Sequence, residues 1–324
     1  MQRSGSGFDL LGYAVQDAPV HDKNFSTTLM AEHLKSLIET LGAKTKQIVL
    51  IAGVGDSLLR HAELPFAPVG DLRQMLKLNS KNYLQQDLPD YVFDCYILPP
   101  RAGTKPVDVI KPNQKCKVLV GGAKKQFLEL LQASAKEASL TVDQVAPGLM
   151  ATANAFEMAQ PEPFEREVVA LVDIGFKHSS ISILLNGELT LSRVVAIGGD
   201  RITTGLTEAL NISYAEAEGI KVGMPEQVQA MMLPLLTPLG RELRASIDFF
   251  EHQQDKSVSQ VFVSGGSARS QFIVEALQSE LMVPCKSWNP VSYLNLALPA
   301  QQAADLEQIA PQLAVAAGGA VAAF

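Results

Sequence analysis

Three polar turns in this sequence stand where apolar runs end, and such turns can hold a phosphate group or a metal ion. The first is Asp173-Ile-Gly175, which closes an apolar run from residue 168 and leads through Phe-Lys-His at 176–178 into another. Carboxylate oxygens are ligands that Mg²⁺ prefers. Glycine lets backbone N–H groups approach a phosphate because it carries no Cβ. The plainer alternative is a β-hairpin with a solvated tip.

The other two turns have the same form. Gly198-Gly-Asp200 ends the apolar run from residue 189, and Ser264-Gly-Gly-Ser267 ends the run from residue 260. The helix expected after Ser267 can add its dipole to an anion site. None of the three turns fits GxGxxG or GxxxxGK[ST], so a Rossmann dehydrogenase and a P-loop protein are both disfavoured. One turn form repeated three times in order favours a shared phosphate site.

The composition excludes several classes of function. The chain has 324 residues, 47% of them hydrophobic, and a net charge of −7, which suits two domains or one domain with insertions. It has no basic stripe, so nucleic acid is not expected as a partner. The three cysteines are widely spaced, which favours a reducing compartment. No secretory signal is evident, and residues 309–324 are too weakly apolar to cross about 30 Å of hydrocarbon. We expect a cytoplasmic protein that does not insert directly into a membrane.

The periodicity of apolar residues predicts the elements that position the turns. The expected strands are 168–174, 180–185, 189–197 and 260–264, with the hairpin turn Asn186-Gly187 before the third. The expected helices are 201–210, 214–222, 236–253 and 270–281. Each of the three polar turns thus lies between a buried strand and the element that follows it.

The first half of the chain has a different order of expected helices and strands, and it contains an insertion. The elements expected before it are a strand at 8–15, a helix at 28–41 capped by Thr27 or Thr28, and strands at 47–52 and up to Pro65. Between residues 66 and 141 a small α+β module is expected, with elements at 71–85, 91–98, 115–120 and 124–138 and a Pro-rich loop at 99–106. Both ends of this module return to the lobe that it interrupts. A helix of small residues at 313–324 is suited to close packing against a sheet.

Four blocks carry a resemblance to the actin-like ATPases. They are Asp173-Ile-Gly175, Gly198-Gly199-Asp200, Glu218-Gly-Ile-Lys221 and Ser264-Gly265-Gly266-Ser267. The chain most closely resembles the PilM family of type IV pilus assembly and, more distantly, FtsA of cell division. The resemblance covers nearly the whole chain and is strongest between residues 168 and 290. It implies an α/β, two-lobed actin-like (ribonuclease H-like) fold with an inserted small α+β subdomain.

The resemblance also implies how the chain divides. Residues 1–165 are expected to form the first lobe, with a partner-binding α+β subdomain inserted at about 66–141 and a C-terminal helix at 311–324 returning to this lobe. Residues 166–300 are expected to form the second lobe, with a helical subdomain at about 200–240.

A nucleotide site follows from the same resemblance. It implies that Asp173 orients a water bound to Mg²⁺, that Glu218 and Lys221 frame the ribose and adenine of ATP, and that two glycines let adenosine lie against the backbone. The whole implied set is Asp173, Gly175, Phe176, Lys177, His178, Gly198, Gly199, Glu218, Lys221, Gly265, Gly266 and Ser267. Plainer alternatives stay open: a solvated hairpin lysine at 177, a surface ion pair between 218 and 221, and a tight strand–helix turn at 265–266.

Two departures from the family weaken the expectation of catalysis. No Asp-x-Gly precedes Asp56, so the first strand of the family and its phosphate loop are expected to be missing. Relatives commonly carry a glutamate at the start of the helix behind the phosphates, where this chain has Gly148. Losing a positioned base typically costs about 10²–10⁴ in rate. ATP hydrolysis is therefore expected to be weak or absent.

The resemblance implies a scaffold of a type IV pilus or type II secretion-like assembly. It would bind the cytoplasmic tail of a bitopic PilN-like inner-membrane protein, between the first lobe and the inserted module, and lie peripheral to the inner membrane through that partner. Self-association into a homo-oligomer is compatible with it. The alternatives are an FtsA-like division ATPase, which would want a basic amphipathic tail, and an actin-fold small-molecule kinase, which would want a second acidic loop.

Overall fold

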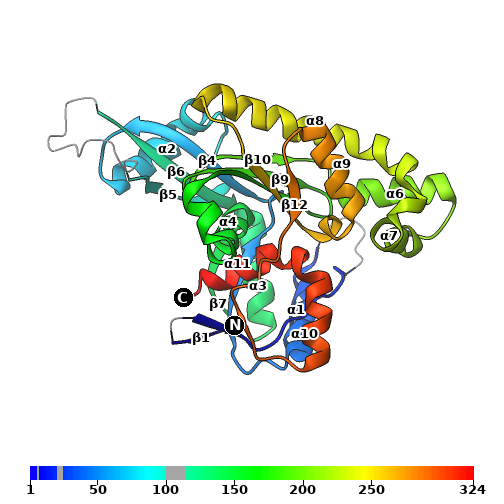
Figure 1. The fold of residues 1–324 in the computed structure, drawn as a ribbon. Coiled ribbons are helices and arrows are strands. Elements are labelled where there is room, and N and C mark those ends of the chain that lie inside the picture. Colours follow the sequence, from blue (N-terminus) through cyan, green and yellow to red (C-terminus); the bar gives the residue numbers. More distant parts are fainter. Residues whose placement is uncertain (6, 20–24, 100–113) are drawn as a thin grey trace.

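The computed structural model describes residues 1–5, 7–19, 25–99 and 114–324. The predicted Pro-rich loop at 99–106 lies, apart from Pro99, outside these residues. A large sheet crosses the middle of the molecule, with α8 and α9 over one face and α4 and α11 under the other (Figure 1). A smaller sheet with α2 lies at one end, and α1, α3 and α10 lie below (Figure 1).

The large sheet has the strand order β10-β9-β8-β11-β12. Its strands are β8 (Val168–Ile174), β9 (Ser179–Leu185), β10 (Glu188–Val195), β11 (Gln260–Ser264) and β12 (Cys285–Ser287). β9 pairs antiparallel with β8 and β10, whereas β11 runs parallel to β8 and β12. Val172 and Ile174 enter the core on the α8 side, whereas Val169 and Leu171 enter the core on the α4 side. Because side chains alternate along a strand, Asp173 faces the α4 side and the first lobe.

The helices over this sheet are α6 (Gly199–Leu210), α7 (Tyr214–Gly223), α8 (Gln229–Gln254) and α9 (Gln271–Leu281). Short 3-10 turns lie at Pro225–Gln227 and Gly266–Arg269. α7 begins with a capping box of Ser213 and Glu216. α8 starts at Gln229 rather than at the predicted residue 236, although it contains Pro234 and Pro238. Met232 and Leu236 are buried, so packing against the core holds the turns that contain the prolines in the helix.

The smaller sheet has the order β4-β6-β5 and is fully antiparallel. Its elements are β4 (Ser57–Pro65), α2 (Val69–Leu84), β5 (Tyr91–Ile97) and β6 (Lys115–Lys124). α2 covers one face and encloses a core that includes Leu64, Leu72 and Val118. This sheet begins at Ser57, before the predicted module start at residue 66, because β4 pairs along its whole length with β6. The division into lobes and subdomain remains a prediction.

The first half of the chain also builds a two-stranded parallel sheet. Its strands are β3 (Gln47–Ala52) and β7 (Thr141–Pro147), flanked by α3 (Lys125–Glu137) and α4 (Gly148–Ala159). α1 (Thr27–Leu41) packs on α3, whereas α5 (Pro161–Arg166) packs against β8 and β9 of the large sheet. A third group joins β1 (Gln2–Ser4), β2 (Gly7–Leu10) and β13 (Asn295–Leu296). The strand predicted at 8–15 ends at Leu10, and β7 was not predicted. The N-cap of α1 is Ser26, whose hydroxyl accepts the Leu29 N–H, rather than Thr27 or Thr28.

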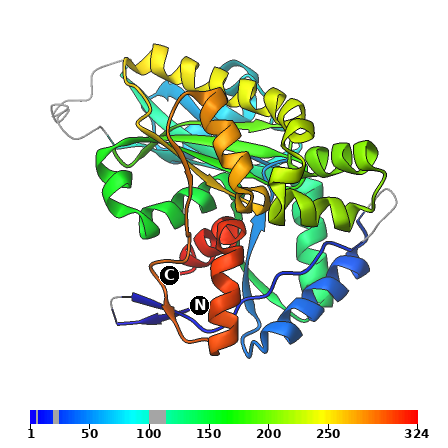
Figure 2. The same cartoon turned by 45° about the vertical axis from the view of Figure 1, so that its right-hand side comes forward.

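The end of the chain returns to the first half through α10 (Ala300–Ile309), a 3-10 turn (Ala310–Leu313) and α11 (Ala314–Val321). α11 lies against α4 and β3, and Figure 2 shows it beside the early strands. A Cβ at Gly318 would overlap the Ala151 carbonyl, so the two helix backbones touch directly. In the described part of the chain no helix has the length and apolarity to cross a membrane.

Candidate functional site

The end of β8 places Asp173 on the side of the sheet that faces the first lobe. Its Oδ1 accepts a hydrogen bond from the Ser264 hydroxyl at 2.8 Å. Burial raises the pKa of Asp173 above its usual value, and the hydrogen bond from Ser264 opposes that rise. Ser264 was not among the predicted site residues. The two residues stand opposite each other in the parallel β8–β11 register, a pairing that the sequence does not reveal.

The turn after Asp173 closes on itself and reaches the first lobe. Gly175 donates its N–H to His178 O at 3.1 Å. Phe176 and Lys177 are exposed at the tip. The His178 imidazole lies against Gly55, where a Cβ would come within 2.8 Å of the ring. This turn therefore forms part of the contact between the two halves of the molecule.

The start of α6 packs its backbone directly on that turn. Gly199 donates its N–H to Gly175 O at 2.9 Å, and Asp200 donates to Phe176 O at 3.0 Å. A side chain at Gly198 would overlap the Phe176 carbonyl. Both N–H groups are thus occupied by carbonyls of the chain, and the need for glycine at 198 comes from backbone packing. A phosphate-binding role for Gly198 and Gly199 stays a prediction.

The turn after β11 contains two glycines in different environments, one with a hydrogen-bonded N–H and one with free space beside its Cα. Gly265 has a φ of 92° and donates its N–H to Pro311 O at 2.8 Å. Gly266 has open space, with no atom closer than 3.9 Å to a Cβ built on it. Ser267 is buried, and its hydroxyl lies where a Gly199 side chain would be. The turns at 198–199 and 265–267 therefore meet, and the predicted site residues of both lie together.

A buried lysine lies beside this meeting point. Lys221 is 1% exposed, and its Nζ donates to Thr203 Oγ1 at 2.8 Å and to Glu218 Oε2 at 2.5 Å. Burial lowers the pKa of Lys221, while the hydrogen bond and charge of Glu218 oppose that change. Its Nζ would be 3.4 Å from a Cβ at Gly199. The alternative of a surface ion pair is wrong for Lys221, because its ammonium group is buried.

The first lobe contributes a turn at 53–56 opposite the turn at 175–178. Asp56 Oδ1 accepts from Lys124 Nζ at 3.0 Å, so this carboxylate is held at the base of the smaller sheet. Gly148 is the first residue of α4 and is buried, and a Cβ there would lie 3.2 Å from a backbone oxygen. The residue at the start of α4 therefore offers neither a side chain nor much room for one.

These residues fit one half of a nucleotide site. Asp173 is the single carboxylate of its turn and would hold Mg²⁺ through water, and a Cβ built on Gly266 would meet no atom closer than 3.9 Å. Over the described ranges, no three His, Cys, Asp or Glu side chains group as a metal centre. The predicted second-lobe residues do come together around α6 and β11, and their nucleotide role stays a prediction.

A slot of about 660 Å³ lies between the outer face of the smaller sheet and the first lobe. We call it the sheet slot, and it is lined by Val92, Tyr96, Leu119, Gly121, Ala123, Leu128, Gln132, Pro147 and Met150, among others. A Cβ at Gly121 would meet Pro147 Cγ at 3.6 Å and Leu59 Cδ1 at 3.7 Å, which is ordinary contact. Gly121 therefore forms a bare floor that a larger side chain would fill. The Gly-Gly pair at 121–122 within a strand was the available sequence signal.

The edge strand β5 beside this slot is partly capped. Asp94 Oδ1 accepts the N–H of Cys95 at 2.7 Å. Arg73 donates to both oxygens of Asp94, at 2.7 and 2.9 Å, and holds the pKa of that carboxyl below its usual value. An edge N–H that already donates to a side chain is not free to pair with a further strand. At Cys95, β5 is therefore closed to pairing with a further strand.

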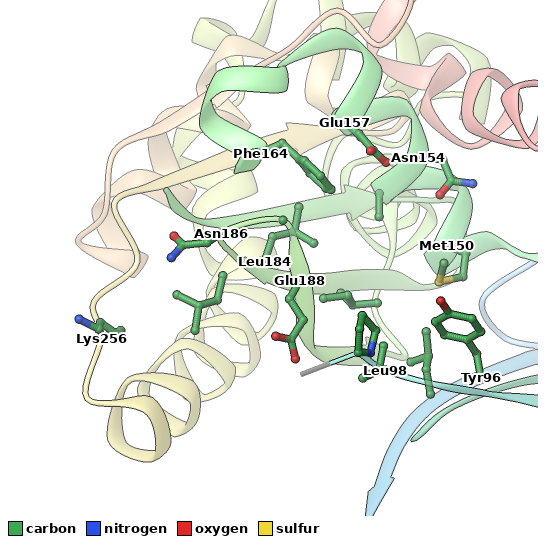
Figure 3. Close-up of a pocket in the computed structure, with 16 residues that line it drawn as sticks. Tyr96, Leu98, Met150, Asn154, Glu157, Phe164, Leu184, Asn186, Glu188 and Lys256 are labelled. Atoms are coloured by element: carbon green, nitrogen blue, oxygen red, sulfur yellow. The ribbon is translucent and has the colours of Figure 1, made fainter. Parts of the chain in front are cut away.

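A second cavity of about 680 Å³ adjoins the sheet slot, and we call it the hairpin hollow. Its walls come from the end of β5, from α4 and α5, and from the β9–β10 hairpin (Figure 3). Tyr96, Leu119 and Met150 line both cavities. Neither cavity is lined by a residue of the predicted nucleotide site.

Comparison with known proteins gives the family. The sequence matches the family described as type IV pilus assembly protein PilM over residues 10–324. The cell division protein FtsA of Bacillus subtilis (strain 168) is 43% identical over 53 residues, which are 16% of this chain and 12% of FtsA. The matched stretch therefore spans about an eighth of the length of that curated relative.

Solved structures give the fold. A PilM–PilN type IV pilus biogenesis complex superimposes with a TM-score of 0.79 and 20% identity, covering 99% of this chain and 89% of that chain. MreB5 of Spiroplasma citri bound to ADP gives a TM-score of 0.53 and 10% identity, covering 95% and 77%. The predicted actin-like α/β fold is thereby confirmed. Because the family match runs from residue 10 to residue 324, this chain belongs to the PilM family of type IV pilus assembly proteins.

Proposed function

We propose that this chain is a scaffold of a type IV pilus or type II secretion-like assembly, and that it binds the cytoplasmic tail of a PilN-like inner-membrane protein in the sheet slot. The solved PilM–PilN complex, whose PilM fold this chain shares, supports the choice of partner. The observation that carries the proposal is the sheet slot itself, an apolar cavity of about 660 Å³ with a glycine floor. Through that tail the chain would lie peripheral to the inner membrane.

The slot suits a short extended peptide. Its walls are mainly apolar, and Val92 and Tyr96 are 53% and 64% exposed on the outer face of β5. Burial of apolar surface yields about 25 cal/mol per Å², so covering such side chains favours association. Gly121 and Pro147 set the width of the slot. Small side chains of the peptide would pass over Gly121, and larger ones would lie beside Val92 and Tyr96.

Filling the slot from within tests the proposal. Gly121→Leu places a side chain over the floor without backbone overlap, since even the nearest contacts to a Cβ there are 3.6–3.7 Å. We expect it to weaken binding of a synthetic PilN-like tail peptide at least tenfold, which is about 1.4 kcal/mol, in isothermal titration calorimetry. Gly70→Leu, at an open position in α2 of the same subdomain, is the control and should bind like the wild type. Unchanged affinity in folded Gly121→Leu would move the docking site elsewhere.

We also propose that ATP, with Mg²⁺, binds the second-lobe residues and that turnover is weak or absent. The convergence of Asp173, Gly266 and Lys221 around one turn supports binding. Gly148 at the start of α4, and the pairing of Asp56 with Lys124, support slow hydrolysis, because neither position presents a free base. Self-association of the actin-like fold into a homo-oligomer is part of the same proposal.

A further inference from the structure

The hairpin hollow continues the sheet slot along β5. The shared residues Tyr96, Leu119 and Met150 form a common wall, so a chain leaving the slot past Tyr96 enters the hollow directly. Figure 3 shows Met150 beside Tyr96 at one end of the hollow and Lys256 at the other. An extended peptide advances about 3.3 Å per residue, and a few residues beyond the slot therefore suffice to reach the hollow.

The chemistry of the hollow differs from that of the slot. Its lining is mostly apolar, including Leu98, Phe164 and Leu184. Its charged members are Glu188 on β10, Lys256 at the far end and Glu157 on α4, and Asn154 lies one turn from Glu157. Glu157 is exposed, and Figure 3 places both side chains above the cavity, on the wall nearer to Met150 than to Lys256. A carboxylate beside an amide on an apolar wall can receive a lysine or arginine whose aliphatic stem packs on that wall.

The composition of cytoplasmic tails supplies the complement. Segments on the cytoplasmic side of a membrane span carry an excess of Lys and Arg within about 15–20 residues of the span. A tail whose apolar part lies in the slot would therefore bring a basic side chain close to its apolar residues. Glu157 stands where such a side chain would arrive after passing Tyr96 and Met150.

We propose that the tail peptide extends from the sheet slot into the hairpin hollow and places a lysine or arginine against Glu157. This inference rests on the proposed function and adds the chemistry that the partner must have: an extended apolar segment with an adjacent basic residue. Glu157 is the specificity-determining residue for that basic group. An exposed ion pair contributes modestly and is screened by salt, so its signature is charge selectivity and salt dependence rather than high affinity.

The test uses the full chain and two synthetic peptides by fluorescence anisotropy. One peptide is the membrane-proximal cytoplasmic segment of a PilN-like protein from the same organism, and the other has its Lys and Arg replaced by norleucine. The protein variants are Glu157→Gln, Glu157→Lys and, as a control of equal charge change on α10, Glu307→Lys. We expect the natural peptide to bind about threefold more weakly to Glu157→Gln and about tenfold more weakly to Glu157→Lys at low salt, with the loss reduced at 0.5 M salt.

The norleucine peptide should bind all four proteins alike. Equal losses for both peptides, equal losses in Glu307→Lys, or no loss in Glu157→Lys would each overturn the inference, as would a natural tail without Lys or Arg. Failure of the proposed function looks different: the tail peptide would then not bind the wild type, or Gly121→Leu would leave its binding unchanged. A tail that binds, that Gly121→Leu excludes and that ignores position 157 would overturn the inference alone.

Discussion

At the scale of single residues, Asp173 is the residue proposed to bind Mg²⁺ through water, and its carboxyl lies where burial disfavours the ionised form. Burial raises the pKa of Asp173, so the folded state binds a proton at pH values where the unfolded state does not. Stability is therefore gained as pH falls through the raised folded pKa, and the ionised carboxylate is a cost at neutral pH. We expect Asp173→Asn, which can still accept from Ser264, to raise Tm by about 1–2 °C at pH 7.

The pH series checks this assignment. Scanning calorimetry from pH 7 to pH 3 should show the gain in Asp173→Asn shrinking toward acid pH, because the wild-type carboxyl is then protonated as well. A variant that is less stable than the wild type at pH 7 would contradict the prediction.

Replacing Gly199 or Gly219 by alanine should change the free energy of unfolding in opposite directions. A Cβ at Gly199 would overlap the Ser267 hydroxyl, whereas Gly219, inside α7, has open space. We expect Gly199→Ala to lower the free energy of unfolding by about 1–3 kcal/mol. Gly219→Ala should raise it by about 0.5–1 kcal/mol, the difference in helix propensity. Urea denaturation of both variants decides; equal effects would mean that the turns at 199 and 267 do not pack as described.

At the scale of elements, the β5 edge shows how an exposed strand is kept from unwanted pairing. Arg73 and Asp94 are both largely exposed, so their pair contributes little to stability. Their larger role is to occupy the Cys95 N–H. We expect Asp94→Ala to change stability little but to increase self-association, measured by dynamic light scattering at rising concentration. Lys125→Ala, in another exposed ion pair, is the control, and equal association of both variants would refute the role of the cap.

The elements also show what the sequence could and could not reveal. Apolar runs bounded by polar turns predicted β8 and β9, and the Asn186-Gly187 turn predicted the hairpin to β10. β7 was missed because its burial depends on pairing with β3, which lies almost a hundred residues earlier in the chain. The first turns of α8, before residue 236, were not predicted. They contain Pro234, which disfavours a helix locally, and the burial of Met232 in the core outweighs that preference.

In the candidate site too, some features can be predicted from the local sequence and others depend on tertiary packing. The glycines at 198–199 and 265–266 follow two strands of the same sheet, β10 and β11, and the two turns meet in the structure. The engagement of their N–H groups by distant carbonyls, such as Pro311 O on the Gly265 N–H, depends on tertiary packing. The burial of Lys221 and the sheet slot likewise arise only when separate elements meet, so no local pattern could show them.

At the scale of the whole molecule, nucleotide binding should depend on residues from two different turns of the second lobe. Asp173→Ala and Gly266→Val are expected to weaken binding of a fluorescent ATP analogue tenfold or more, the latter by filling the open space beside the turn. Gly219→Ala is the control. Steady-state hydrolysis should stay at least a hundredfold below the typical enzyme value of about 10 s⁻¹, and Gly148→Glu alone should not restore it. Unchanged affinity in both folded variants would rule out these two turns as a nucleotide site.

The packing of α11 has a consequence for the order in which the molecule can form. Gly318 brings α11 into backbone contact with α4, and Ala314 and Ala317 join the same core as Phe156. Yet the ribosome makes the entire second lobe between these two helices. At about 5–20 residues per second, the first half must wait on the order of ten seconds with one wall of its core open, while the second lobe can already fold. The half that is synthesised first is therefore the half that completes its core last. During synthesis, the first half is the part that would need a chaperone.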